Sequence, residues 1–449
     1  MSEAFRDLTE RVGFLHKVES ANRIGAGQLK ISPRAITFEM PVDDTVASEL
    51  GMPSFPSGDQ EVEIPAKLIF RDRYGFIGLG RCRYRSSTSS TFGDRPGSLK
   101  LEAEYAVEIG SMEQDYWSVN GLRSEIGGLA AWAGLSSVVT PPPETDSRGL
   151  IIEVSQTAKA RDPISIGTDF GLKLYPHFST QHSSTNGVYT IIEKTFVQTQ
   201  TPQTIPWEKH VRVHQMVQDL VVIARWTQCG LRVHSANNID HPIVKISTGE
   251  PLGEKWRDAI ATWGGRGDWS TPMTIESNRP ALFRLADVGA PGLRRWIEEY
   301  DSWTRIVGPL VTSRFQKHLP VEALLMQIAV SIEGLGHRIG LMTGRISNPT
   351  SSLSFPQYLD LIYQSLNCQI TPVIYGSPDN GISSFPDFAT WADAFNTAYK
   401  EAKHADHPLP DHVRAWVLAE SGALLLRLWL AQEFGVAPAR LDQNARYSA

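Results

Sequence analysis

Cysteine is scarce in this chain, and long apolar runs are absent. Only three cysteines occur, Cys82, Cys229 and Cys368, and they lie far apart in the sequence. This spacing argues against a disulfide framework and a thiolate zinc site, so we expect small buried side chains instead. No apolar run approaches the ~18 to 20 residues of a membrane-spanning helix, and residues 1–17 lack the apolar segment of a secretory signal. We therefore expect a cytoplasmic protein.

A surplus of basic residues is also missing. The formal net charge is −6, and residues 293–449 contain 13 Lys and Arg against 15 Asp and Glu. A protein that coats nucleic acid usually neutralises the phosphates with a basic excess. If this chain binds RNA, we expect a local pocket rather than a broad basic face.

The apolar pattern divides the 449 residues into parts, and a chain of this length suggests about two to three domains. Residues 1–205 are rich in alternating and β-branched runs, which predict an antiparallel, sandwich-like or barrel-like region with strands at 61–70, 74–85, 99–109, 149–155 and 187–200. Residues 206–290 are expected to complete this region with an amphipathic helix over 207–228 and a mixed segment. The predicted fold class is α+β and multidomain.

Residues 293–449 show helical spacing and predict an all-α bundle of four to five helices. One long helix should begin at Pro320, and its predicted buried face consists of Val321, Leu324, Leu325, Ile328, Ile332, Leu335 and Ile339. A shorter helix is expected near 355–366. Ser384 and Asp387 form a capping pattern for the next helix, and Asp411 is the expected N-cap of the last. The predicted inward face of that last helix contains Val413, Trp416, Val417, Leu424 and Leu428.

The penultimate helix, expected over 388–407, carries an unusual polar stripe. A helical wheel gives it a core face of Trp391, Phe395, Ala398, Ala402 and Ala405, and an opposite stripe of Asn396, Lys400, Lys403, His404 and His407. The spacing leaves three interpretations open. The stripe is a solvated surface that complements the helix dipole, or a metal site of His404, His407 and His412. The third interpretation is general acid–base chemistry on RNA, because imidazole can exchange the proton of a 2′-hydroxyl while a cation stabilises phosphorane charge.

Three stretches carry a resemblance to a known family. "VEALLMQIAVSIEGLGHRI" and "FNTAYKEAKHADHPLPD" resemble the helical domain of HEPN proteins, and "GVYTIIEKTFVQTQTPQTIPWEKHVRVHQMVQDLVVIA" resembles the N-terminal half of ApeA-like anti-phage proteins. The resemblance implies a metal-independent endoribonuclease without a cofactor, dimeric through its helical domain. It also implies RNA as substrate, with tRNA as one candidate, and a phage-derived trigger that leads to abortive infection.

The resemblance also implies roles for five residues. His404 would be the acid–base residue, His407 the second proton-transfer group and Lys400 the group that stabilises phosphate charge. Asn396 and Glu333 would orient them.

The chain departs from the family's Arg-x(4 to 6)-His motif. Tyr399 stands five residues before His404, and the cation in range is Lys400, which gives Lys-x6-His with His407. Lysine keeps the positive charge but lacks the planar fork of arginine. Three alternatives follow: Lys400 substitutes with reduced power, another arginine such as Arg338 or Arg414 takes the missing role, or the domain is a catalytically degenerate dimerisation or binding module. A literal Arg-x4-His at residues 11–16 lies outside the helical part and is discounted.

Overall fold

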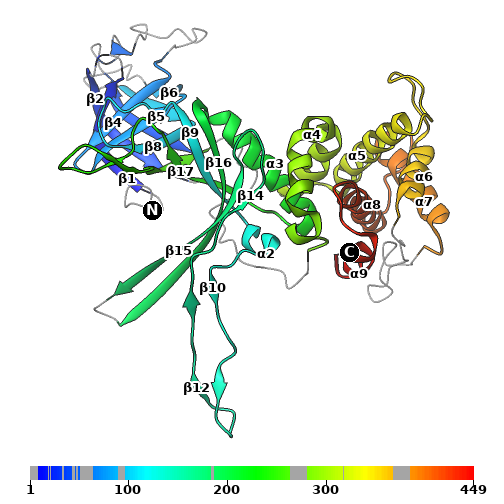
Figure 1. The fold of residues 1–449 in the computed structure, drawn as a ribbon. Helices are drawn as coiled ribbons and strands as arrows, with labels where there is room; N and C mark the ends of the chain where they lie inside the picture. The colour runs from blue at the N-terminus through cyan, green and yellow to red at the C-terminus, as the bar shows by residue number, and fades with distance from the viewer. Residues whose placement is uncertain are drawn as a thin grey trace.

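The structure is a computed structural model that describes residues 9–18, 20, 22–32, 35–42, 46, 49–50, 64–88, 97–183, 187–262, 281–316, 318–367 and 385–448. An antiparallel sheet region is followed by a helical region, and the two lie side by side (Figure 1). The predicted α+β class, with a β-rich N-terminal part and a helical C-terminal part, is confirmed.

Fourteen strands in the described part of the chain form one sheet in which every neighbouring pair is antiparallel. From one edge to the other, their order is β14 (Ile164–Ser165), β15 (Lys173–Ser183), β16 (Val188–Pro206), β9 (Ser118–Ile126), β17 (Leu231–Asn237), β20 (Trp256–Ala261), β8 (Tyr105–Ile109), β5 (Gly75–Gly80), β4 (Lys67–Asp72), β1 (Thr9–Lys17), β2 (Arg23–Ile31), β3 (Ile36–Val42), β7 (Gly97–Ala103) and β6 (Arg83–Thr88). β17 and β20 come from the mixed segment after α3 and extend the sheet.

Two of the predicted strands are each divided in two. Residues 74–85 form β5 and β6, because Arg81 adopts a left-handed backbone (φ 51) that a continuous strand does not allow. Residues 99–109 form β7 and β8, separated at Glu104, whose amide donates to the carbonyl of Gly80 at 3.0 Å. The single strands expected over these two ranges are therefore wrong in extent but right in type.

Three short hairpins stand apart from the large sheet. They pair β10 (Val138–Val139) with β13 (Thr157–Ala158), β11 (Glu144–Thr145) with β12 (Ile151–Glu153), and β18 (Ile243–Val244) with β19 (Pro251–Gly253). The first two form an arm that extends away from the sheet beside the β15–β16 ribbon (Figure 1). The predicted strand over 149–155 belongs to this arm, where its side chains are exposed.

Helix α3 (Trp207–Arg225) lies between the sheet and the helical region (Figure 1). Its start is anchored because the indole of Trp207 donates to the carbonyl of Tyr116 at 2.8 Å. On its other side Trp296 donates to the carbonyl of Met216 at 2.7 Å. One core cluster runs from the sheet through α3 into the bundle, and a second cluster fills the β1–β8 part. The predicted helix over 207–228 is confirmed, although it ends three residues earlier.

Six helices build the described helical region: α4 (Leu285–Phe315), α5 (Val321–Met342), α6 (Phe355–Ser365), α7 (Phe388–Lys403), α8 (His412–Glu433) and α9 (Pro438–Ser448). The prediction of four to five helices missed short α9. The boundary expected near 287–292 falls inside α4, at a kink where Gly289 has φ 70. A five-residue helix, α2 (Leu129–Ala133), also packs against α3. Cys82 and Cys229 are buried, while Cys368 and the capping residue Ser384 lie outside the described residues.

The predicted buried face of α5 is confirmed from Leu324 to Ile339, with Val321 only partly buried. The prediction for α8 is partly wrong. Val417, Leu424 and Leu428 are buried, but Val413 and Trp416 are 47% and 49% exposed. The middle of α8 is apolar all round and is enclosed by its neighbours, whereas its first turns extend beyond them. A helical wheel cannot detect this difference in coverage.

Candidate functional site at the end of helix α7

The candidate site is built on α7, whose start is fixed by a side-chain cap. Asp387 accepts a hydrogen bond from the amide of Thr390 at 2.8 Å, which satisfies one of the free donors of the first turn. Trp391, Phe395 and Ala398 are buried, as the wheel predicted. These contacts hold α7 against the bundle and direct its polar residues outward.

The helix ends at Lys403, four residues earlier than predicted. Ala402 is only partly buried and Ala405 is exposed, so the apolar face that holds the helix in place ends there. His404 is the C-cap in an extended conformation, and Pro408 disfavours helix at the residue before it. His404 and His407 are therefore not on a helical stripe, but they remain neighbours, with ring centroids 6.2 Å apart. The amide of His407 donates to the carbonyl of His404 at 3.1 Å.

Glu333, Tyr399 and Lys403 form a chain of hydrogen bonds between α5 and α7. The Tyr399 hydroxyl donates to Glu333 Oε1 at 3.2 Å, and Lys403 Nζ donates to the same hydroxyl at 3.2 Å. Burial raises the pKa of Tyr399, and the hydrogen bond to Tyr399 raises the pKa of Lys403. The lysine therefore stays charged at a defined position one residue before His404.

Lys400 and Asn396 are placed less firmly. Lys400 is exposed, and among the described residues no ion pair or side-chain hydrogen bond holds its ammonium group. Asn396 is partly buried one turn earlier on the same helix. The structure thus brings Glu333 to the lysine that the sequence did not single out, Lys403, rather than to Lys400.

Of the two alternative arginines, Arg338 is engaged by other groups. Arg338 lies over the ring of Trp303 at 3.7 Å and donates to the carbonyl of Ser302 at 3.2 Å, which binds it to α4. Arg414 lies in the exposed first turn of α8, where its backbone amide is capped by Asp411 as predicted. Access to the phosphate would therefore require Arg338 to leave its place on the indole.

The metal interpretation gains no support from the geometry. His404, His407 and His412 are all exposed. Within the described ranges, no group of three or more His, Cys, Asp and Glu side chains is arranged to hold a metal ion.

The Arg-x4-His match at residues 11–16 is structural. Arg11 is buried and forms an ion pair with Asp72, and His16 is buried in the same sheet. Discounting this match is therefore supported by burial.

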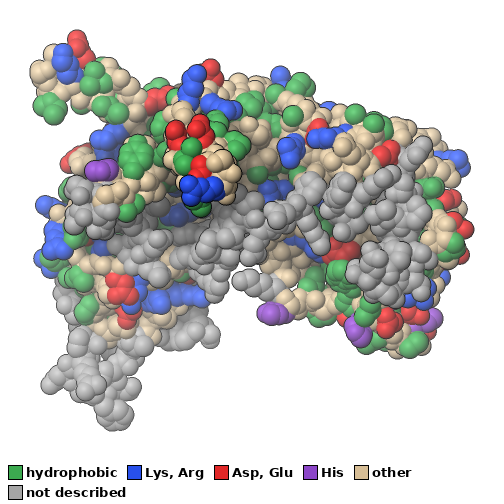
Figure 2. Space-filling view, turned by 90° about the horizontal axis from the view of Figure 1, so that it is seen from below, with side chains coloured by type: hydrophobic (Ala, Val, Ile, Leu, Met, Phe, Trp, Pro, Cys, Tyr) green, Lys and Arg blue, Asp and Glu red, His purple; other side chains and the backbone are tan. Residues whose placement is uncertain are grey.

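The surface around the site carries mixed charge. Figure 2 shows histidine side chains at the surface of the helical region, with acidic and hydrophobic side chains close by. Blue and red side chains are interspersed over the described part of this face. Any RNA contact on this side is consequently local, in line with the low basic content of the sequence.

Sequence reasoning missed Tyr399 and Lys403 as site residues. Tyr399 attracted notice only because it occupies the place of the motif arginine. Lys403 follows it by four residues, a spacing that puts both on one helical face. That signal identifies the pair, but the acidic partner Glu333 lies 66 positions away and requires the tertiary fold.

The protein has two parts. An antiparallel sheet region is joined through α3 to a helical bundle that carries imidazole and ammonium groups at its surface. A family described as ApeA N-terminal domain 1 matches residues 21–252, just over half of the chain. The chain belongs to this family, which supports a protein of anti-phage defence. The match lies within the sheet region and does not include α4–α9. No curated protein and no solved structure matches the chain significantly.

None of the helices in the described ranges is long and apolar enough to span a membrane.

Proposed function

We propose that this protein is an anti-phage effector whose helical region is a HEPN-type domain that cleaves RNA without a metal and thereby causes abortive infection. The observation that carries the proposal is the pair of exposed imidazoles of His404 and His407, whose ring centroids lie 6.2 Å apart. The residue before them, Lys403, has its ammonium held by Tyr399. Family membership supports the defence role. The proposal places the protein in the cytoplasm with its RNA substrate, for which tRNA is one candidate.

The proposed reaction is attack by the 2′-oxygen on the adjacent phosphorus. One imidazole, assigned to His404, takes the 2′-hydroxyl proton, the P–O5′ bond breaks, and His407 gives a proton to the leaving 5′-oxygen. The products are a 2′,3′-cyclic phosphate and a 5′-hydroxyl. A base or acid needs to lie about 3 Å from the proton it exchanges, and rings 6.2 Å apart can reach opposite sides of one phosphodiester.

In this proposal two lysines, Lys400 and Lys403, stabilise the negative charge of the transition state. Lys400 stabilises the phosphorane charge from the exposed side, as the resemblance implies. Lys403 supplies a second positive charge that Tyr399 and Glu333 hold in place. Positioned charges contribute more to transition-state stabilisation than mobile ones, because they need no reorganisation during the reaction. Glu333 therefore acts as a positioning residue, and Asn396 keeps its proposed orienting role.

The test uses the full chain incubated with total RNA and tRNA in EDTA, with lysate from phage-infected cells as a source of trigger. His404→Gln should abolish cleavage, while the matched control His412→Gln, also an exposed histidine, should cleave like wild type. Cyclic-phosphate ends that disappear only in the His404 variant support the proposal. Fragments with 3′-hydroxyl ends, or equal cleavage by both variants, would contradict it.

The missing arginine gives a second test of the same mechanism. Lys400→Arg restores a planar fork that can grip two phosphate oxygens, and we expect faster cleavage. Lys400→Gln removes the charge and should slow cleavage by about 10- to 1,000-fold, as other losses of one oxyanion-stabilising group do. Equal rates for the two variants would exclude a role for this position in catalysis.

A second candidate is a catalytically degenerate module that binds a partner or a second copy. It is favoured by three exposed apolar side chains beside the histidines, Leu409, Val413 and Trp416, which are 71%, 47% and 49% exposed. Their spacing places the last two on one face of α8. If His404→Ala loses phage protection but keeps its sedimentation coefficient, catalysis is supported. If Leu409→Ser together with Val413→Ser dissociates a dimer and no RNA is cut, the binding module is supported.

A further inference from the structure

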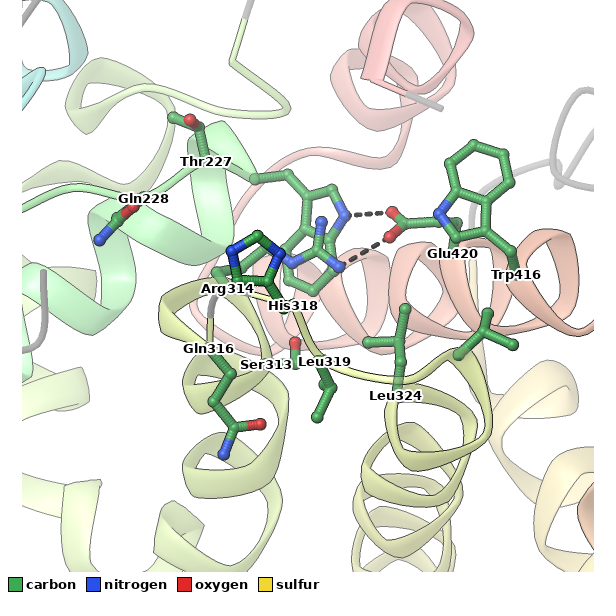
Figure 3. A pocket seen from close by; sticks show the side chains of 12 residues that line it. Thr227, Gln228, Ser313, Arg314, Gln316, His318, Leu319, Leu324, Trp416 and Glu420 are labelled. Carbon is green, nitrogen blue, oxygen red and sulfur yellow. Dashed lines mark hydrogen bonds and ion pairs between the residues drawn. The ribbon is translucent and has the colours of Figure 1, made fainter. Parts of the chain in front are cut away.

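A cavity of about 490 Å³ lies where the sheet region meets the helical region (Figure 3). Its walls come from the turn after α3, the turn between α4 and α5, and the first half of α8. The side chains that matter here are Trp226, Gln228, Arg314, His318, Trp416 and Glu420. The lining of the cavity does not include His404 or His407, and the cavity belongs to neither part of the protein alone.

The wall of the cavity is also the link between the two regions. Trp226 Nε1 donates to Glu420 Oε2 at 2.6 Å, and Arg314 Nη2 donates to Glu420 Oε1 at 2.7 Å (Figure 3). The guanidinium of Arg314 lies over the Trp226 ring at 4.2 Å. Behind them, Arg427 of α8 donates to the carbonyl of Ile223 at 2.7 Å and so caps the end of α3. An occupant of the cavity would therefore touch the residues that join sheet to bundle.

Unusual backbone conformations gather at this cavity. Among the described non-glycine residues, only Arg81, Trp226 and His318 have a positive φ. Trp226 and His318 line the cavity. Such conformations cost about 1 to 3 kcal/mol each and concentrate at ligand clamps and switches. Trp226 is the left-handed C-cap of α3, and its amide donates to the carbonyl of Val222, so the end of the helix accounts for its conformation. His318 adopts its positive φ in the turn between α4 and α5.

The polar groups of the cavity favour an anionic group on its occupant. Arg314 Nε is buried and has no hydrogen-bond partner in the described residues, and an unsatisfied buried donor is costly until an acceptor reaches it. Glu420 and Arg314 form an ion pair, so their charges offset each other and the preference for an acceptor rests on the unpartnered Nε donor of Arg314. The imidazole of His318 is a second group that can donate to a phosphate oxygen.

The remaining walls favour a flat heterocycle. Trp416 is 49% exposed and presents an indole on which a base can stack. The amides of Gln228 and Gln316 offer both donors and acceptors at the rim, as the edges of a base require. The volume lies in the range of about 300 to 1,000 Å³ that is usual for small-molecule sites.

We propose that this cavity binds a free nucleotide, with its base on Trp416 and its phosphate at Arg314 and His318. The nucleotide would contact α8 and both turns together, so its binding favours the arrangement in which Trp226 and Glu420 are joined. The site would make the link between the sheet region and the helical region responsive to the nucleotide pool. This inference goes beyond RNA cleavage and does not depend on it.

The experiment is calorimetric titration of the full chain with each of the four ribonucleoside 5′-monophosphates. The matching nucleosides and inorganic phosphate serve as ligand controls. We expect at least one nucleotide to bind with a Kd below about 1 mM and to quench tryptophan fluorescence. Trp416→Ala should weaken binding by about 10-fold or more, because stacking of one base contributes on that order. Val413→Ala, one turn earlier on the same exposed face, should bind like wild type.

The outcomes separate this site from the proposed nuclease site. His404→Gln should leave nucleotide binding unchanged, and His318→Gln should weaken the nucleotide but not the nucleoside. The proposal is overturned if no nucleotide binds, or if Trp416→Ala binds as tightly as wild type. Binding of a short single-stranded RNA without any binding of free nucleotide would overturn it too, because the occupant would then be RNA.

Discussion

Acidification from about pH 7.5 to about pH 5 should destabilise the sheet region by about 4 kcal/mol through two buried histidines. His210 Nε2 lies 3.1 Å from the carbonyl of Val119, so it must carry a proton, and Nδ1 accepts from the Thr199 hydroxyl at 2.8 Å. The same hydroxyl accepts from His214 Nε2 at 3.0 Å, and Ser124 donates to His214 Nδ1 at 2.7 Å. Every ring nitrogen is used, and both rings are neutral.

The magnitude follows from proton uptake by the unfolded chain. Burial lowers the pKa of His210 to about 4. Burial lowers the pKa of His214 well below its ordinary value, and the charge of the neighbouring His210 lowers it further. An unfolded histidine has a pKa of about 6.5. As the pH falls below that value, the unfolded chain binds protons that the native chain does not bind. For each histidine, the free energy of unfolding therefore decreases by about 1.4 kcal/mol per pH unit. Over the stated interval each histidine contributes about 2 kcal/mol.

The assay is urea unfolding at a series of pH values, followed by tryptophan fluorescence. His214→Gln removes one of the two groups that bind a proton only in the unfolded chain, while the glutamine amide can still bond with Thr199 and Ser124. The free energy of unfolding of this variant should therefore fall less steeply below about pH 6. The control His182→Gln removes an exposed histidine of β15 and should keep the wild-type slope. Parallel pH profiles for wild type and His214→Gln would refute the reasoning, because the buried ring would then not resist protonation.

Three further predictions concern packing and the candidate site. Arg427→Met removes the side-chain donor of the Ile223 carbonyl at the end of α3 and should lower the free energy of unfolding by about 2 kcal/mol in urea titrations. Tyr399→Phe breaks the chain between the α5 carboxylate and the last lysine of α7, and should cost about 1 to 2 kcal/mol and slow RNA cleavage without unfolding the protein. Gly336→Ala places a Cβ 2.5 Å from the Tyr358 side chain and should lower Tm.

The order of the sheet region and the helices along the chain could be predicted, because each element type shows in the periodicity of apolar residues nearby in the sequence. The helical spacing from Val213 to Ala224 predicted α3, and the apolar face from Leu324 to Ile339 predicted α5. In each case the side chains that recur along the sequence are those buried in the fold. Caps such as Asp411 are also local, because donor and acceptor lie within one turn.

The strand order could not be predicted, because it depends on pairings between distant segments. β9 lies between β16 and β17, and β20 joins the two halves of the large sheet. The exposure of Trp416 is likewise a property of where neighbouring helices end. No periodicity within α8 encodes it.

The candidate site likewise contains residues that could be found from local sequence and others that only the tertiary fold brings in. The cluster of lysines and histidines near His404 is visible in the sequence, because its members are adjacent. Its acidic partner comes from α5, and the shortening of α7 at Lys403 depends on where the apolar contact surface ends. The cavity beside Trp226 draws on three segments that are distant in the chain, so local patterns could not predict it.

The central claim is that His404 performs acid–base chemistry on RNA. The most direct measurement is end-group mapping of tRNA fragments produced in EDTA by wild type and by His404→Gln, with infected-cell lysate present. The account predicts 2′,3′-cyclic phosphate ends for wild type and none above background for the variant. Identical fragments from both proteins, or no cleavage by wild type, would contradict it.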